Sequence, residues 1–121
     1  MKPTLLIVDD VQRIREEARL ALEGEFDIVG EAKDGIEAID LFRRTLPTLI
    51  LMDVVMPNMS GIEATRILMQ GPAPHPKIVL FSALKEESVV KEGMKAGACI
   101  YLFKPVPGEK LIEVLKRFAK T

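Results

Sequence analysis

The sequence is poor in the residues that mark disulfide-rich, membrane-spanning or nucleic-acid-binding proteins. Its 121 residues include one cysteine, one histidine, one tyrosine and no tryptophan. The single Cys99 excludes an internal disulfide framework and suits a reducing, cytoplasmic setting. No apolar run approaches the ~20 residues that cross a bilayer, and we expect no signal peptide. With 17 basic and 18 acidic residues, the net charge of −1 predicts no direct binding to nucleic acid or an anionic membrane.

Five short apolar segments alternate with five segments of helical periodicity. The strands are predicted at residues 5–8, 26–29, 49–52, 78–81 and 99–103. Unbroken apolar runs such as Leu49–Met52 are typical of strands buried on both faces of a parallel sheet. The helical segments are expected to bury Val11, Ile14, Ala18 and Leu22, then Ile36, Ile39 and Phe42, then Ile62, Ile67 and Leu68, and finally Leu111, Val114, Leu115 and Phe118. This alternation predicts one doubly wound α/β domain over residues 1–121.

Helix boundaries are marked by capping residues. Asp34 with Glu37, and Ser60 with Glu63, have the spacing of a capping box. Pro107 suits the first turn of the last helix.

The fourth predicted helix, about Glu86 to Ala96, differs from the others. Its apolar face is thin, and Gly93 inside it costs about 1 kcal/mol of helix stability. Gly97 should end it. We expect a segment of low local stability.

Chemically useful side chains follow four of the predicted strands. Asp9 and Asp10 close the first apolar run, Asp53 closes the third, Ser82 follows the fourth and Lys104 the fifth. Open α/β sheets bind ligands at the carboxyl ends of their strands. Parallel strands would therefore bring three carboxylates, a hydroxyl and an ammonium group to one edge.

Each of these residues also has an ordinary structural explanation. Asp10 could cap the first helix, and Asp53 and Ser82 could be loop or turn residues. Lys104 could be one more solvated lysine. Two adjacent acids at a buried strand end repel each other without a cation, however, and the joint pattern favours a single site.

The set is chemically coherent as a phosphoryl-transfer site. Three carboxylates around one point would each have a raised pKa unless a hard cation neutralised them. Mg²⁺ prefers oxygen ligands, and a carboxylate can act as a nucleophile and form an aspartyl phosphate. Lys104 and Ser82 would then supply donors to the transferred phosphoryl group. Asp53 stands alone opposite the Asp9–Asp10 pair, so we predict it to be the acceptor.

Over its whole length the chain resembles the receiver domain of two-component response regulators. The resemblance rests on Asp9-Asp10, on Asp53 followed by Met56-Pro57 and Gly61, on Ser82-Ala83 and on Lys104-Pro105. It implies a five-stranded parallel sheet in the order 2-1-3-4-5, flanked by five helices. It also implies a regulatory domain rather than an enzyme, catalysing only its own phosphorylation and slow self-dephosphorylation.

The resemblance also assigns roles within the site. Asp53 would take a phosphoryl group from a sensor histidine kinase, a phosphotransfer protein or a small phosphodonor. Asp10, Asp53 and the carbonyl of Val55 would bind Mg²⁺, with Asp9 acting largely through water. Lys104 would pair with the phosphoryl group, and its bond to Pro105 would be cis.

Ser82 and Tyr101 occupy the switch positions of that family. On phosphorylation Ser82 would move towards the phosphoryl group and the Tyr101 ring would turn inward. The alternative for Tyr101 is a half-buried strand aromatic with its hydroxyl at the surface. The fourth helix, fifth strand and fifth helix would form the face that a downstream output protein or domain reads. A phosphorylation-dependent homodimer is a further partner to test.

Two other predictions concern signal lifetime and kinase docking. Val55 and Leu84 would flank the path of a hydrolytic water, and because both are apolar we hypothesise slow self-dephosphorylation. The exposed side of the first helix, where kinases dock in this family, is interpreted as a solvated face. It carries Gln12, Arg13, Arg15 and Glu16.

Three alternatives stay open at this stage. The chain could be the receiver of a longer DNA-binding or enzymatic regulator. A haloacid-dehalogenase-like phosphatase also uses a strand-end aspartate with Mg²⁺, but it needs a second acid where Val55 stands. A flavodoxin-like FMN module would need a Ser/Thr-rich phosphate loop in place of Asp9-Asp10.

Overall fold

The computed structural model describes residues 1–121 and has strictly alternating strands and helices. In chain order these are β1 (Thr4–Val8), α1 (Gln12–Leu22), β2 (Asp27–Ala32), α2 (Gly35–Thr45), β3 (Leu49–Asp53), α3 (Gly61–Gln70), β4 (Lys77–Ser82), α4 (Glu87–Ala96), β5 (Ile100–Phe103) and α5 (Gly108–Ala119). All five strands are parallel, in the order β2-β1-β3-β4-β5. The predicted doubly wound fold is confirmed.

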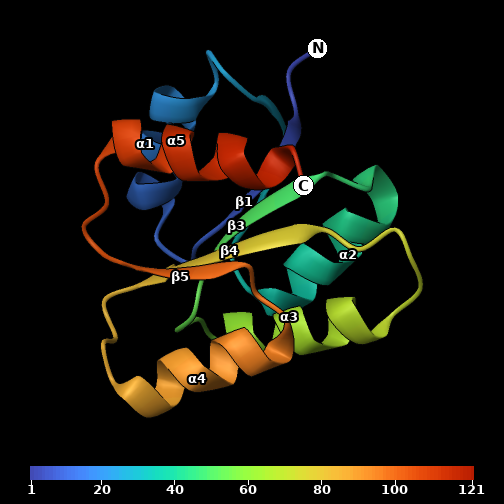
Figure 1. Ribbon diagram of the computed structural model, residues 1–121, viewed down its shortest axis with the longest axis vertical. Coiled ribbons are helices and arrows are strands. Elements are labelled where there is room, and N and C mark those ends of the chain that lie inside the picture. The colour runs from blue at the N-terminus through green and yellow to red at the C-terminus, as the bar shows by residue number, and fades with distance from the viewer.

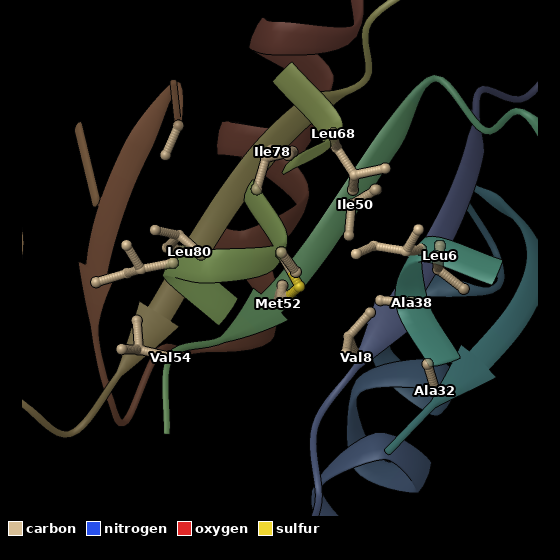
Figure 2. Close-up of a cluster of buried hydrophobic side chains, with 14 of the residues drawn as sticks. Leu6, Val8, Ala32, Ala38, Ile50, Met52, Val54, Leu68, Ile78 and Leu80 are labelled. Carbon is tan, nitrogen blue, oxygen red and sulfur yellow. The ribbon is translucent and has the colours of Figure 1, made fainter. Parts of the chain in front are cut away.

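The sheet lies between two layers of helices. Helices α1 and α5 cover one face, and α2, α3 and α4 cover the other (Figure 1). Successive residues of a strand point to opposite faces, so Leu5 and Ile7 pack with α1 and α5. Leu6 and Val8 pack on the opposite side with Ile50 (Figure 2). None of the helices is long and apolar enough to cross a membrane.

The predicted helix ends are mostly confirmed. The Asp34 Oδ1 atom accepts the N–H of Glu37 at 2.8 Å, and Ser60 Oγ accepts the N–H of Glu63 at 3.1 Å. Gly97 ends α4 with a φ of 120°, a conformation that favours glycine. These caps fix where α2 and α3 begin beside the carboxyl edge of the sheet.

Five residues are placed differently from the prediction. Cys99 lies just before β5, and Pro107 lies just before α5 rather than in its first turn. Val11 precedes α1 in extended conformation and is 42% exposed, because the helix begins one residue later. Ile36 is 55% exposed. The buried face of α2 is centred on Gly35 and Phe42, and each residue advances about 100° around a helix. Phe26 is buried but lies just before β2 rather than within it.

Gly93 has a packing role in α4. A Cβ atom at this position would lie 2.9 Å from Leu80 Cδ1 and 3.4 Å from Tyr101 Cδ2. The glycine therefore lets the backbone of α4 approach β4 and β5 closely, which compensates for the thin apolar face of this helix.

Candidate functional site

Three aspartates meet at the carboxyl edge of the sheet, as the sequence predicted. Strands β1 and β3 are paired with Val8 opposite Met52, so the residues that follow are neighbours. The carboxylates of Asp9, Asp10 and Asp53 offer oxygen atoms that lie within 4.8 Å of one another. Asp9 and Asp53 are buried, and Asp10 is exposed.

Lys104 supplies the positive charge at this cluster. Its Nζ atom lies 2.8 Å from Asp9 Oδ2 and 3.3 Å from Asp53 Oδ2. The same ammonium lies 4.5 Å from the centroid of the buried Phe81 ring, in cation–π geometry. The peptide bond from Lys104 to Pro105 is cis, as predicted.

The environment of Asp53 opposes its ionisation. Burial raises the pKa of this carboxyl group, while the Lys104 ammonium lowers it and the charge of Asp9 raises it further. The Asp53 Oδ1 atom also accepts the N–H of Val54 at 2.7 Å. A hard cation next to Asp53 would favour its charged form. Three carboxylates with oxygen as their only donor atom could hold a hard divalent cation.

Asp10 does not cap helix α1. The first position of that helix is preceded by Val11, and no side chain caps it. Instead Asp9 Oδ1 accepts the N–H of Val11 at 2.9 Å. The Asp10 carboxylate makes no hydrogen bond or ion pair within the chain, so its oxygen atoms are free to take a ligand.

The loop after Asp53 is braced by contacts that the sequence did not reveal. Asn58 has a φ of 67° and donates from Nδ2 to Asp34 Oδ2 at 2.8 Å. The N–H of Gly35 donates to the carbonyl of Met59 at 3.0 Å. The N–H of Glu37 and the Asn58 amide together lower the pKa of Asp34. The start of α2 thus holds the β3–α3 loop in place.

Gly61 allows α3 to begin against this same loop. A Cβ atom at Gly61 would lie 2.0 Å from the carbonyl oxygen of Asp53, which is far inside van der Waals contact. The N–H of Gly61 donates to the carbonyl of Val54 at 2.9 Å. Only glycine permits this close approach beside the central carboxylate.

Ser82 and Tyr101 converge on the backbone of Leu84. The Ser82 Oγ atom accepts the N–H of Leu84 at 3.2 Å, and the Tyr101 hydroxyl donates to the carbonyl of Leu84 at 2.9 Å. Both side chains are buried, and burial raises the pKa of Tyr101. The Tyr101 ring therefore packs against the core, while its hydroxyl lies in a part-buried contact with the loop after β4.

Arg15 was expected on a solvated face of α1, and that expectation is wrong. Its side chain is only 15% exposed and contacts Glu31 at the end of β2. It also donates from Nη1 to the carbonyl oxygen of Asp9 at 2.6 Å. No local pattern could have indicated this contact, because Glu31 lies on another element.

Val55 lies in the loop between β3 and α3, and Leu84 lies in the loop between β4 and α4. The Val55 side chain is 57% exposed, and Leu84 is half-buried against the core. Both positions follow a site residue by two, and neither presents a polar side chain to the site.

Comparison with known proteins places this arrangement in a family. Residues 5–116 match the family described as the response regulator receiver domain. The chain is 40% identical to the transcriptional regulatory protein DegU of Brevibacillus brevis over 98% of its own length and 51% of that protein. It is 32% identical to the chemotaxis protein CheY of Listeria monocytogenes, over 96% of this chain and 98% of CheY.

A solved structure agrees in fold. The signal receiver domain of the putative response regulator NarL from Mycobacterium tuberculosis superimposes with a TM-score of 0.94 at 30% identity. The match covers 98% of this chain and 97% of that one. The chain spans about half the length of the transcriptional regulator it matches and nearly all of the chemotaxis protein.

Proposed function

The chain belongs to the response regulator receiver domain family, and from this premise we propose that it is a phosphorylation-activated switch of a two-component phosphorelay. It accepts a phosphoryl group on Asp53 and needs Mg²⁺ to do so. The observation that carries this proposal is the cluster of three carboxylates within 4.8 Å, with Lys104 between two of them. Members of the family are regulatory rather than catalytic, which leaves the phosphatase alternative without support.

Asp53 acts as the nucleophile in the proposed transfer. One of its oxygen atoms attacks phosphorus, the bond from phosphorus to the donor breaks, and the donor leaves with the electron pair. When held by Asp9, Asp10, Asp53 and the Val55 carbonyl, Mg²⁺ would supply positive charge to the phosphoryl oxygens. Lys104 gives up part of its pairing with Asp53 and holds a phosphoryl oxygen instead.

Ser82 and Tyr101 connect this event to a distant surface. Their shared contact with Leu84 links the end of β4 to the ring on β5. Movement of the Ser82 hydroxyl towards the phosphoryl group removes a hydrogen bond from the loop that Tyr101 also holds. The face formed by α4, β5 and α5 then changes, and Met94 and Phe103 expose apolar surface there for a partner.

The phosphoryl group is proposed to leave slowly. The side chains that flank the expected path of water, Val55 and Leu84, carry no group that could orient it. The chain would then catalyse only its own phosphorylation and a slow self-dephosphorylation.

The donor is a sensor histidine kinase or a phosphotransfer protein. We place this chain in the cytoplasm, where its free Cys99 stays reduced. A cavity of about 570 Å³ between α1 and α5 supports docking beside the site, since its lining includes Ile14, Leu111 and Lys104 itself. For the output, the greater identity to a transcriptional regulator than to a chemotaxis protein favours a DNA-binding partner domain.

Phosphorylation by acetyl phosphate tests the proposal. We expect the wild-type chain to gain one phosphoryl group by mass spectrometry when Mg²⁺ is present, and to gain none after chelation. Asp53→Asn should stay unmodified. NMR with beryllofluoride should shift residues 84–118, and gel filtration of the same samples reports any homodimer. Modification at another residue, or equal modification in a chelator, would contradict the proposal.

A further inference from the structure

The guanidinium of Arg15 reaches from α1 to the backbone of the acidic turn. Its Nη1 donates to the carbonyl oxygen of Asp9 at 2.6 Å, and its Nε donates to Glu31 Oε1 at 3.2 Å. Glu31 is held a second time by Arg19, whose Nη2 lies 3.0 Å from Oε2. One planar side chain therefore joins the turn after β1 to the last residues of β2.

The Asp9 carbonyl that Arg15 contacts lies, along the chain, between two of the three carboxylates of the cluster. It belongs to the planar peptide group between Asp9 and Asp10, so holding it restrains the relative placement of the two Cα atoms from which the carboxylates extend. The Asp9 N–H is also held, by the carbonyl of Ala32 at 3.0 Å. Together these bonds attach both sides of Asp9 to the end of β2.

The ion pair between Arg15 and Glu31 is less exposed to water than most ion pairs of this chain. The side chains of Arg15 and Glu31 are 15% and 22% exposed, against 44% for Arg19. Exposed pairs contribute little because water screens them. A hydrogen bond from a charged, partly buried donor to a carbonyl is stronger and more directional.

We propose that Arg15 is a positioning residue for the metal site, acting through the Asp9–Asp10 peptide rather than by touching the ion. This inference rests on the proposed function, because it concerns Mg²⁺ held by Asp9, Asp10 and Asp53. Only an arginine can do this, since its fork serves the Asp9 carbonyl and Glu31 at once, whereas a lysine offers one compact ammonium. Groups that orient metal ligands from outside the ligand set typically matter 10–100-fold in metal affinity.

The decisive comparison is between Arg15→Lys and Arg19→Lys. Both variants keep the charge of α1 and weaken a contact to Glu31, and only the first removes the bond to Asp9. Titrating metal-free protein with Mg²⁺ by calorimetry, we expect Arg15→Lys to bind on the order of 10-fold more weakly than wild type. Arg19→Lys should bind within about twofold of wild type. Urea unfolding in chelator measures the stability of each variant separately.

Each outcome decides the inference. A purely structural role would lower the stability of Arg15→Lys and leave its Mg²⁺ affinity unchanged, which overturns the proposal. Equal weakening by Arg19→Lys also overturns it. If Arg15→Lys does not fold, Glu31→Ala removes the outer anchor of the same guanidinium and must weaken Mg²⁺ binding. A wild-type chain that binds no Mg²⁺ overturns the proposed function itself.

Discussion

The Lys104 ammonium lies 2.8 Å from Asp9 Oδ2, and Asp9 has no exposed surface. This pair joins the end of β5 to the end of β1 across the ends of β3 and β4. A buried carboxylate without a positive partner is costly. Lys104 therefore neutralises part of the negative charge that a bound metal ion would also neutralise.

Lys104→Met should therefore make the metal-free chain much less stable. Removing one partner of a buried pair costs roughly 3–5 kcal/mol, and since Lys104 is 18% exposed we expect the lower part of that range. Saturating Mg²⁺ should restore more stability to the variant than it adds to wild type, because the ion neutralises the same acids. Urea unfolding followed by circular dichroism, in chelator and in Mg²⁺, measures both effects.

Lys110→Met is the control, because Lys110 pairs only with Glu113 on the exposed side of α5. It should change stability little. A Lys104→Met chain as stable as wild type in chelator would show that the ion pair between Lys104 and Asp9 contributes nothing to the free energy of unfolding.

The raised pKa of Asp53 predicts how stability depends on pH. The folded chain holds this proton more firmly than the unfolded chain, whose aspartate has the ordinary value of 3.8. Between that pH and the raised folded pKa, the folded state binds more protons, so stability falls as pH rises. Asn carries no charge at any pH, so Asp53→Asn should be more stable than wild type at pH 7 in chelator.

That advantage should shrink as the pH is lowered through the raised folded pKa and level off below 3.8, where wild-type Asp53 becomes protonated in both states. Thermal unfolding at a series of pH values gives the difference directly. An advantage that stays constant across the series would contradict the burial argument.

Gly61→Ala should disturb the site as well as the fold. The new methyl group would have to displace the carbonyl of Asp53, from which it would be 2.0 Å away. Overpacking of this kind costs about 1–3 kcal/mol, and the shifted loop should slow phosphorylation by acetyl phosphate. Gly24→Ala, which meets no atom within 4 Å, is the matched control and should be neutral in both measurements.

Val55→Asn should shorten the life of the phosphorylated chain. An amide at this exposed position can orient water towards the phosphoryl group, whereas the natural valine cannot. We expect a half-life several-fold shorter after removal of the phosphodonor, followed by mass spectrometry. Val55→Ile keeps the position apolar and should leave the half-life unchanged. An equal or longer half-life in Val55→Asn would remove the case for slow self-dephosphorylation.

Sequence reasoning recovered the features that depend on local pattern. The run Leu49–Met52 indicated a doubly buried strand because a central parallel strand has no polar face. Asp34 and Ser60 marked helix starts because capping needs only residues three apart. The aspartates and Lys104 were found because the ends of parallel strands meet at one edge.

The contacts that lie outside local pattern were missed. Arg15 pairs with a residue 16 positions away, and Asn58 with one 24 positions away, so neither spacing carries a signal. Ile36 has the right apolar character, but it is turned about 100° from the buried centre of α2. Periodicity identifies a face without fixing which residue at its border is covered.

Gly93 lets the backbone of α4 pack directly against the sheet. At this point the helix meets Leu80 and Tyr101 with backbone alone, and no side chain interlocks there. Because no side chain fixes the helix at Gly93, a small rotation of α4 about this point would move its two ends in opposite directions. A reorientation of the Tyr101 ring beneath that contact would change the orientation of α4 at the surface without breaking its helical hydrogen bonds.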